Sequence, residues 1–407
     1  MQHARNISRR SFIAGSTGTI VLALAGSSLA LSACARSSSS SSAEEESVVK
    51  TLSVSTDQVV SVSDFTEVTT SDHVTEVNSF DLPIGSILYQ DASVVSAVIM
   101  PSESGRQLAR FGFLDTDSGA LIEALADAER GNDGYVLYDF RANDQIAIWD
   151  EVNLTTQDWC VYVASVDKDH ALKNPTLVES GDVNYDPPLL CVSGKRAFYT
   201  VLPYESGSAS TKDSYLKCAT TSGSPEVVYT SHGRMITNPQ ASDGIVTFVP
   251  RADTTGVYYQ LTAIEADTYD MVAAEILPKG LKVSDAVYMG GAFAFNIEQT
   301  YSTGGGLSSF GTYRAIDDGS YLRFNRTPTD TPALMGGYLY VKSTRTIAGV
   351  DPDKRTYFNI TAVEGCIDYG DFLASVGSAS RLVTFTNVPK GDGSGEGATH
   401  VRVFKSV

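Results

Sequence analysis

The sequence predicts a nearly all-β fold for residues 50–407, and two observations support this. Valine, threonine, tyrosine and phenylalanine recur in short runs of about 4–8 residues that Gly, Asp, Ser and Pro separate. The longest stretch with helical periodicity, 121–130, itself begins like a strand. The order of these strands is then indicated by a repeated turn.

The turn motif recurs along the chain between pairs of apolar runs. Residues 288–295 (YMGGAFAF) are echoed 46 residues later by residues 334–341 (LMGGYLYV). Residues 193–195 and 242–244 fill the same place in two other units. Glycine supplies the positive φ that a two-residue hairpin needs. Each motif is therefore predicted to join the first two strands of a unit.

Prolines and a second set of turns complete the unit. The strand after the first turn often ends in proline, which cannot continue a sheet ladder: Pro101, Pro203, Pro250 and Pro389. A second hairpin turn follows in several units, at 115–119, 220–223, 265–267 and 317–319. Four strands every 43–55 residues is the pattern of a β-propeller blade.

Six blades can be counted in the sequence, at 82–126, 133–180, 187–230, 233–277, 284–325 and 332–371. A seventh would contain 382–387 and 399–405, which supply too few strands for a sheet. Strand-like residues 48–68 are predicted to add its outer strand and close the ring. We expect a β-propeller of about seven blades, with six or eight as alternatives. The alternative architecture is a pair of β-sandwich domains.

Residues 1–33 have the features of an export signal. Arg9 and Arg10 follow Ser8 and precede Phe12, an apolar stretch covers 15–33, and LSAC ends at Cys34. This segment resembles a twin-arginine signal joined to a bacterial lipoprotein box. Only Ala14 departs from the pattern, where lysine is common. The resemblance implies export by the twin-arginine pathway, a lipid on Cys34, and an extracytoplasmic protein anchored in the cell membrane.

Residues 34–49 are expected to form a tether. They contain six serines in a row, at 37–42, and three glutamates, at 44–46. Apolar side chains that would offset the entropy cost of ordering are too few in this segment. The predicted organisation is therefore signal, lipidated tether and propeller domain.

Charge restricts the partners. The net charge of −18 becomes −21 once Arg5, Arg9 and Arg10 of the signal are removed. A field of this sign repels nucleic acid and anionic lipid headgroups, so nucleic-acid binding is excluded as a main function. A glycan, a peptide or a surface protein is the expected partner, and the lipid provides the contact with the membrane.

Cysteine and histidine patterns predict no metal site or cofactor. The cysteines after Cys34 are Cys160, Cys191, Cys218 and Cys366, and they form no CxxC pair. Cys191 and Cys218 are predicted to lie two strands apart in one sheet, too distant for a disulfide. The four mature histidines are not at metal-ligand spacing. Residues 115–119 are interpreted as a hairpin turn, and the acidic segments 182–186 and 351–353 allow at most weak Ca²⁺ binding.

The predicted ligand site lies on one face of the ring, on long connections between second and third strands. These connections are 204–214, 251–256, 299–310, 343–354 and 390–399. The candidate ligand contacts are Tyr204, Arg251 and Tyr301, of which Tyr301 precedes a glycine run. Arg251 could orient a carboxylate or pair with a neighbouring Asp.

Two functions remain open from the sequence. The first is a non-catalytic binding or scaffold module that recognises a glycan, peptide or partner protein through one propeller face. The alternative is an extracellular hydrolase or lyase that uses carboxylates around the channel. No catalytic residue can be nominated among the 48 acids.

Overall fold

The computed structural model describes residues 49–90, 94–205, 211–222, 224–316, 319–367, 369–389 and 397–407. The chain divides into two units, 1–47 and 48–407, and the described residues all belong to the second. The export signal, Cys34 and nearly all of the tether therefore lie outside the described residues. In the described part, no helix has both the length and the apolar character to cross a membrane.

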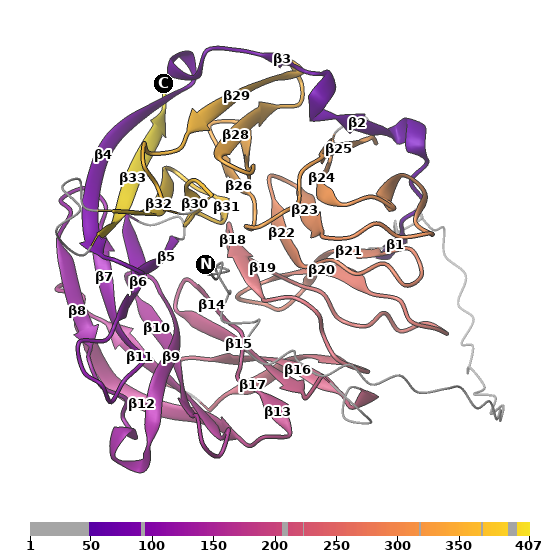
Figure 1. The fold of residues 1–407 in the computed structure, drawn as a ribbon. Helices are drawn as coiled ribbons and strands as arrows, with labels where there is room; N and C mark the ends of the chain where they lie inside the picture. Colours follow the sequence, from indigo (N-terminus) through magenta and orange to yellow (C-terminus); the bar gives the residue numbers. More distant parts are fainter. Residues whose placement is uncertain are drawn as a thin grey trace, which may run out of the picture. The chain divides into compact units, whose positions relative to one another are not determined.

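The described strands form seven sheets that follow one another around a ring (Figure 1). Six of them each take a four-strand antiparallel meander from one continuous segment, with the first strand on the inner side; in the sixth sheet, β31 (Gly377–Ser378) adds a parallel strand inside it. The first three meanders are β5 (Ile87–Gln90) to β8 (Leu121–Leu125), β9 (Tyr135–Ala142) to β12 (Leu172–Gly181), and β14 (Leu190–Ser193) to β17 (Glu226–Ser231). The next three are β18 (Gln240–Ser242) to β21 (Met271–Ile276), β22 (Asp285–Met289) to β25 (Tyr321–Phe324), and β26 (Ala333–Met335) to β29 (Thr356–Thr361).

The middle strands of these six sheets are mostly buried. They are β6 (Val95–Pro101), β7 (Ala109–Asp115), β10 (Ile146–Asn153), β11 (Trp159–Val166), β15 (Arg196–Pro203), β16 (Ser214–Ala219), β19 (Ile245–Phe248), β20 (Gln260–Glu265), β23 (Ala292–Ile297), β24 (Gly311–Ala315), β27 (Tyr338–Lys342) and β28 (Thr346–Asp351). β6 and β15 end at Pro101 and Pro203, as predicted. The turn at Gly290–Gly291 has φ of +54° and +79°, which confirms the reason for glycine there.

The seventh sheet joins the two ends of the described chain. Its strands, from the inside outward, are β30 (Phe372–Leu373), β32 (Leu382–Val388), β33 (Ala398–Ser406) and β4 (Val74–Pro83). Seven apolar clusters lie between successive sheets, and one of them packs the seventh sheet against the first. The ring is therefore closed, and the predicted β-propeller is confirmed.

The N-terminal residues close the ring differently from the prediction. The outer strand of the seventh sheet is β4, which follows the predicted segment 48–68. That segment instead adds an outer parallel strand to three other sheets: β1 (Val49–Thr51) pairs with β21, β2 (Val59–Ser61) with β25, and β3 (Thr66–Glu67) with β29. We call residues 49–73 the strap. Only β4 is long enough to pair with β33, a strand of nine residues.

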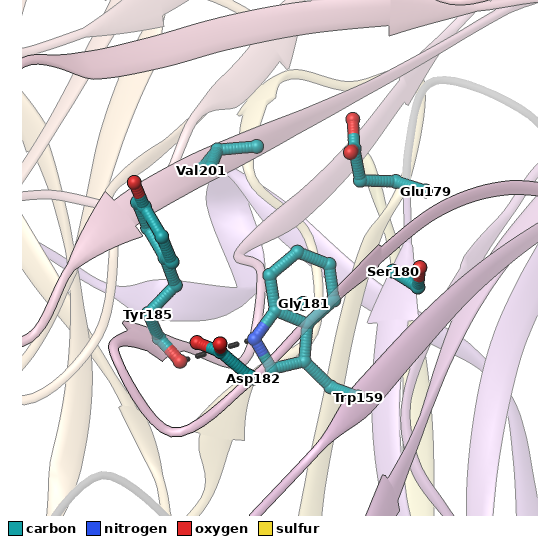
Figure 2. A pocket seen from close by; sticks show the side chains of 7 residues that line it. All are labelled: Trp159, Glu179, Ser180, Gly181, Asp182, Tyr185 and Val201. Carbon is teal, nitrogen blue, oxygen red and sulfur yellow. Dashed lines mark hydrogen bonds between the residues drawn. The ribbon is translucent and has the colours of Figure 1, made fainter.

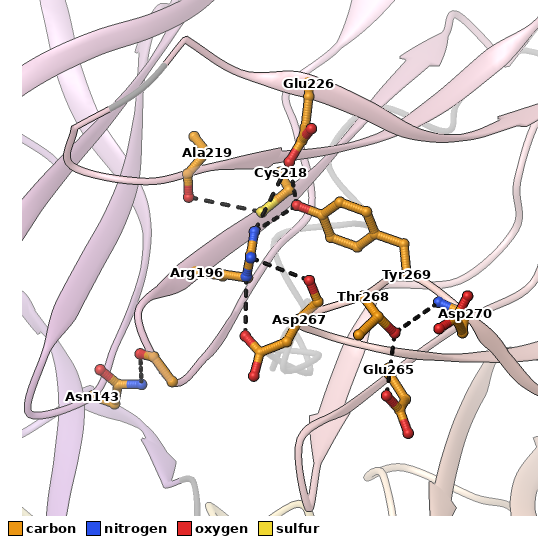
Figure 3. A network of polar contacts seen from close by, with 11 residues as sticks. Asn143, Arg196, Cys218, Ala219, Glu226, Glu265, Asp267, Thr268, Tyr269 and Asp270 are labelled. Carbon is orange, nitrogen blue, oxygen red and sulfur yellow. Dashed lines mark hydrogen bonds and ion pairs between the residues drawn. The ribbon is translucent and has the colours of Figure 1, made fainter.

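Polar contacts join neighbouring sheets where the apolar clusters end. Arg196, at the start of β15, donates from Nη1 to the Tyr269 hydroxyl at 2.7 Å and from Nε to Asp267 Oδ1 at 3.1 Å in the next sheet (Figure 3). The Tyr269 hydroxyl in turn donates to Glu226 of β17. Burial raises the pKa of the adjacent Cys218 thiol. This network is a bridge between the β14–β17 and β18–β21 sheets.

Two further predictions are confirmed and one is wrong. Cys191 and Cys218 lie two strands apart, each opposite Phe198, and both are free thiols. Residues 115–119 form a hairpin turn, in which Asp115 Oδ1 accepts from the amides of Asp117 and Ser118. Residues 343–354 are not one long loop, because they contain β28.

Candidate functional site

The topology places the long connections on one face of the ring. In an antiparallel meander, successive connections lie at opposite ends of the strands. The connections between second and third strands therefore share one end with the links from one sheet to the next. We call this end the loop face. The other end carries short turns such as 194–195, 290–291 and 336–337.

Exposed apolar side chains gather on the loop face. The connections of the loop face that the structure describes carry seven large apolar residues that are exposed: Leu108, Leu154, Val183, Val257, Phe310, Ile367 and Tyr369. The described turns of the opposite face carry one, Val94. The loop face therefore presents most of the exposed apolar side chains outside the strands of the described residues, and it is the candidate functional surface.

Tyr204 and Arg251 lie on this face in adjacent sheets. The Tyr204 amide donates to the Asn184 carbonyl at 2.9 Å. Arg234 lies beside Tyr204, because it bonds the Pro203 carbonyl, and it pairs with Asp186 at 2.6 Å. The Arg251 guanidinium lies 5.8 Å from the Tyr259 ring centroid and forms no ion pair with a described residue.

Tyr301 lies on the same face but holds its own loop in place. Its hydroxyl donates to the Lys282 carbonyl at 3.2 Å and accepts from the amide of Gln299 at 2.9 Å. The glycine run that follows packs on the strap, since the Gly306 amide donates to the Val54 carbonyl at 2.8 Å. The structure thus places Tyr204 and Arg251 on the loop face of adjacent sheets and Tyr301 beside the strap.

A small cavity lies among the innermost strands of the ring. A cavity of about 50 Å³ is lined by residues of the innermost strands, among them Tyr89, Arg141, Cys191 and Gln240. The Arg141 guanidinium lies 3.3 Å from the centroid of the Tyr89 ring and pairs with Asp139. Burial raises the pKa of the Cys191 thiol, so this group is a neutral part of the wall. A space of this volume admits water rather than a substrate.

Carboxyl groups lie where the channel meets the loop face. Asp330 Oδ2 accepts from the Leu373 amide at 2.8 Å. Burial raises the pKa of Asp330 to about 6. The charge of the nearby Lys342 lowers this pKa, whereas the charge of Asp285 raises it. The Gln240 amide donates to Asp285 Oδ1 at 3.2 Å and to Thr331 Oγ1 at 3.1 Å. These bonded residues come from four sheets and connect them around the mouth of the channel.

A larger pocket opens between the β9–β12 and β14–β17 sheets (Figure 2). Its volume is about 480 Å³, within the usual range of ligand sites. Its lining residues are Trp159, Glu179, Ser180, Gly181, Asp182, Tyr185 and Val201. They come from β11, β12, β15, the short edge strand β13 (Tyr185–Asp186) and, for Asp182, the link between β12 and β13. We call it the inter-blade pocket.

The local structure explains the wall of the inter-blade pocket. Trp159 is opposite Gly181, and a Cβ at Gly181 would meet the indole at 2.1 Å, so only glycine lets β12 lie on that ring. The indole Nε1–H donates to the Tyr185 carbonyl at 3.0 Å, which fixes β13 beside it. Figure 2 shows the Tyr185 and Glu179 side chains on either side of the indole. No sequence motif indicates this pocket, because its residues come from two blades.

Metal ligands are not grouped in the described part of the chain. Among those residues, no cluster of three or more His, Cys, Asp or Glu side chains could hold a metal ion. The two segments considered for Ca²⁺ have local bonds instead. Asp182 Oδ1 accepts from the Asn184 amide, and Asp351 pairs with Lys354 at 2.9 Å.

Comparison with known proteins supports the fold. No model of a protein family matches the chain, and no curated protein sequence matches it. Among solved structures, puromycin hydrolase is similar with a TM-score of 0.50 at 12% identity, over 74% of this chain and 50% of that one. The chain thus spans about half the length of that protein. At this identity the likeness shows the fold alone.

Two further solved structures are similar at lower scores. The β-propeller domain of the Trilobed protease from Pyrococcus furiosus has a TM-score of 0.40 at 11% identity, over 62% of this chain and 79% of that one. AztD from Citrobacter koseri has a TM-score of 0.46 at 10% identity, over 79% and 90%.

Proposed function

We propose that this protein is a lipid-anchored, extracytoplasmic binding or scaffold module that recognises a partner through the loop face of its propeller. The single observation that carries the proposal is the unequal distribution of exposed apolar side chains among the described residues, with seven on the loop face and one on the turns of the opposite face. The inter-blade pocket lies at the loop-face end of two sheets and adds a concave site to this face.

The partner is a glycan, a peptide or a surface protein of neutral or positive charge. The mature net charge of −21 favours such partners by long-range electrostatics. Tyr204, Arg251 and Tyr301 remain proposed ligand contacts, Tyr204 and Arg251 on adjacent sheets and Tyr301 through its loop.

A binding screen tests the proposal. The full chain, purified in an uncharged detergent, is applied to arrays of cell-wall glycans, polysaccharides, peptides and surface proteins, with and without Ca²⁺. Each hit is then measured with the loop-face double variant Ile367→Ser/Tyr369→Ser and with Val227→Ser, a control of similar exposure on an outer strand. We expect the double variant to weaken binding and the control to retain it. Equal binding by both variants would place the site elsewhere.

The anchor is tested separately, because Cys34 lies outside the described residues. The Cys34→Ala variant should leave the membrane fraction, since the lipid requires that thiol. Fractionation of cells that express either form measures this. Continued membrane association of the variant would contradict the lipoprotein assignment and favour an uncleaved N-terminal helix.

A hydrolase or lyase is the second candidate. The observation that favours it is the Asp330 carboxyl at the channel mouth, because a pKa of about 6 suits a general acid. If a screen of glycosidic and peptide substrates finds turnover, Asp330→Asn should reduce kcat by about 100-fold or more. Unchanged turnover in this variant would remove the channel mouth as the catalytic site.

A further inference from the structure

The inter-blade pocket has a chemistry that selects its occupant. Two of its lining side chains are carboxylates, Glu179 and Asp182, and none of them is cationic. Lys217 reaches Glu179 from β16 and forms an ion pair with it, so Glu179 is already compensated. Asp182 is exposed, and it forms no ion pair with a described residue. One negative charge of the pocket is therefore left for a ligand.

Cations near the pocket are already in use. Arg234 pairs with Asp186 at 2.6 Å, and Lys217 is held by Glu179. The Tyr199 hydroxyl also donates to Glu179, at 3.2 Å, which fixes that carboxylate in place. An anionic ligand would meet an excess of negative charge here, whereas a cation would find a carboxylate and the partly exposed ring of Tyr185.

The surroundings indicate a polypeptide ligand rather than a free ion. Trp159 pairs with Val152 on one side and Gly181 on the other, so the turn after β10 and the link after β12 lie at the same end of the sheet. These two segments present Leu154, 57% exposed, and Val183, 49% exposed. Apolar side chains on both segments lie beside an acidic pocket. A partner polypeptide could insert one basic side chain into the pocket and cover these apolar side chains at the rim of the pocket.

We propose that the inter-blade pocket binds a lysine or arginine side chain of a partner polypeptide, between the Asp182 carboxylate and the ring of Tyr185. This proposal rests on the proposed binding function and names the chemistry of one subsite within it. The ammonium or guanidinium group donates to Asp182, and the alkyl stem of the side chain lies along the Tyr185 ring.

The test uses two matched peptides and the full chain in an uncharged detergent. The probe is acetyl-Leu-Gly-Lys-Gly-Leu-amide, and its control carries norleucine in place of lysine. Binding is measured by isothermal titration at low salt. We expect the lysine peptide to bind about tenfold more tightly than the norleucine peptide, and to weaken when salt screens the charge.

Variants locate the effect in the pocket. Asp182→Asn removes the charge but keeps an oxygen for the Asn184 amide, so the turn is preserved. Asp144→Asn is the matched control, because it makes the same charge change in an exposed turn on the opposite face of the same sheet. Asp182→Asn should abolish the preference for lysine, whereas Asp144→Asn should leave it unchanged.

The outcomes separate this inference from the proposed function. Equal affinity for the two peptides, or a lysine preference that Asp182→Asn retains, would overturn the pocket assignment. The loop-face proposal would still stand if the partner found in the screen loses affinity with Ile367→Ser/Tyr369→Ser. If Asp182→Asn retains the lysine preference and Ile367→Ser/Tyr369→Ser retains full affinity for the partner, both the pocket assignment and the loop-face proposal would be overturned.

Discussion

At the scale of single residues, Gly306 explains why a glycine run stands in the loop after Tyr301. A Cβ at Gly306 would lie 2.5 Å from the Ser55 carbonyl oxygen and 2.7 Å from a methyl group of Val59. The glycine therefore allows the strap to pass close to the loop. The sequence pattern suggested a ligand loop, and this contact accounts for the glycine within the protein itself.

Gly306→Ala is predicted to push the strap away from the β22–β25 sheet. We expect the free energy of unfolding to fall by about 1–3 kcal/mol, because the backbone must shift to admit the methyl group. Gly105→Ala is the control, since a Cβ there meets nothing within 4 Å. Chemical denaturation measures both variants, and equal stability of the two would show that the strap does not need this contact.

Asp330 is predicted to make stability depend on pH. Its pKa is raised to about 6 in the folded state, whereas an unfolded Asp titrates near 3.8. The folded protein then holds more protons than the unfolded chain between these values, so stability falls as pH rises from about 4 to about 6. The stability lost is of the order of 1–3 kcal/mol.

Asp330→Asn should remove this part of the pH dependence, because the amide does not ionise there and its oxygen still accepts from the Leu373 amide. Denaturation at pH 4, 5, 6 and 7 compares the two proteins. Parallel pH profiles would contradict a raised pKa at Asp330.

At the scale of elements, polar bridges supplement the apolar clusters between sheets. The Arg196 network connects the turn before β15 with the turn between β20 and β21, where Tyr269 has φ of +65°. A tyrosine in the left-handed region is unusual. The Tyr269 hydroxyl accepts from Arg196 and donates to Glu226, and these two bonds stabilise the conformation.

Arg196→Ala is predicted to lower the free energy of unfolding by about 1–2 kcal/mol, because it leaves Glu226 and Asp267 without their shared partner. This value allows for solvent screening of the partly exposed pair. Lys195→Ala is the control, since Lys195 is the exposed neighbour in the same turn. Thermal unfolding compares the two variants. A similar effect of both would assign the loss to the turn rather than to the bridge.

At the scale of the whole molecule, ring closure depends on one strand. β4 is the outer partner of β33, whereas β1, β2 and β3 only add short edges of two or three residues to sheets that are already complete. The strap and the closing strand therefore differ in their importance for the fold, although they are consecutive in the chain.

Two truncated chains test this difference. Removal of residues 1–73 should leave a folded ring of reduced stability, because the seven sheets keep their four main strands. Removal of residues 1–83 also removes β4, exposes the edge of β33 and should cause aggregation. Light scattering and thermal unfolding measure both chains. A soluble, stable chain without residues 1–83 would show that β4 is not required for closure.

The sequence by itself determined the fold class and the positions of six blades, because strand periodicity, glycine turns and terminal prolines are local properties of the chain. It also located Tyr204 and Arg251 on the loop face. Tertiary structure alone decided that β4 closes the ring, that the glycine run holds the strap, and that Trp159, Asp182 and Tyr185 form a pocket. These features depend on contacts between segments far apart in sequence or in different sheets, and such contacts leave no periodic signal in either segment.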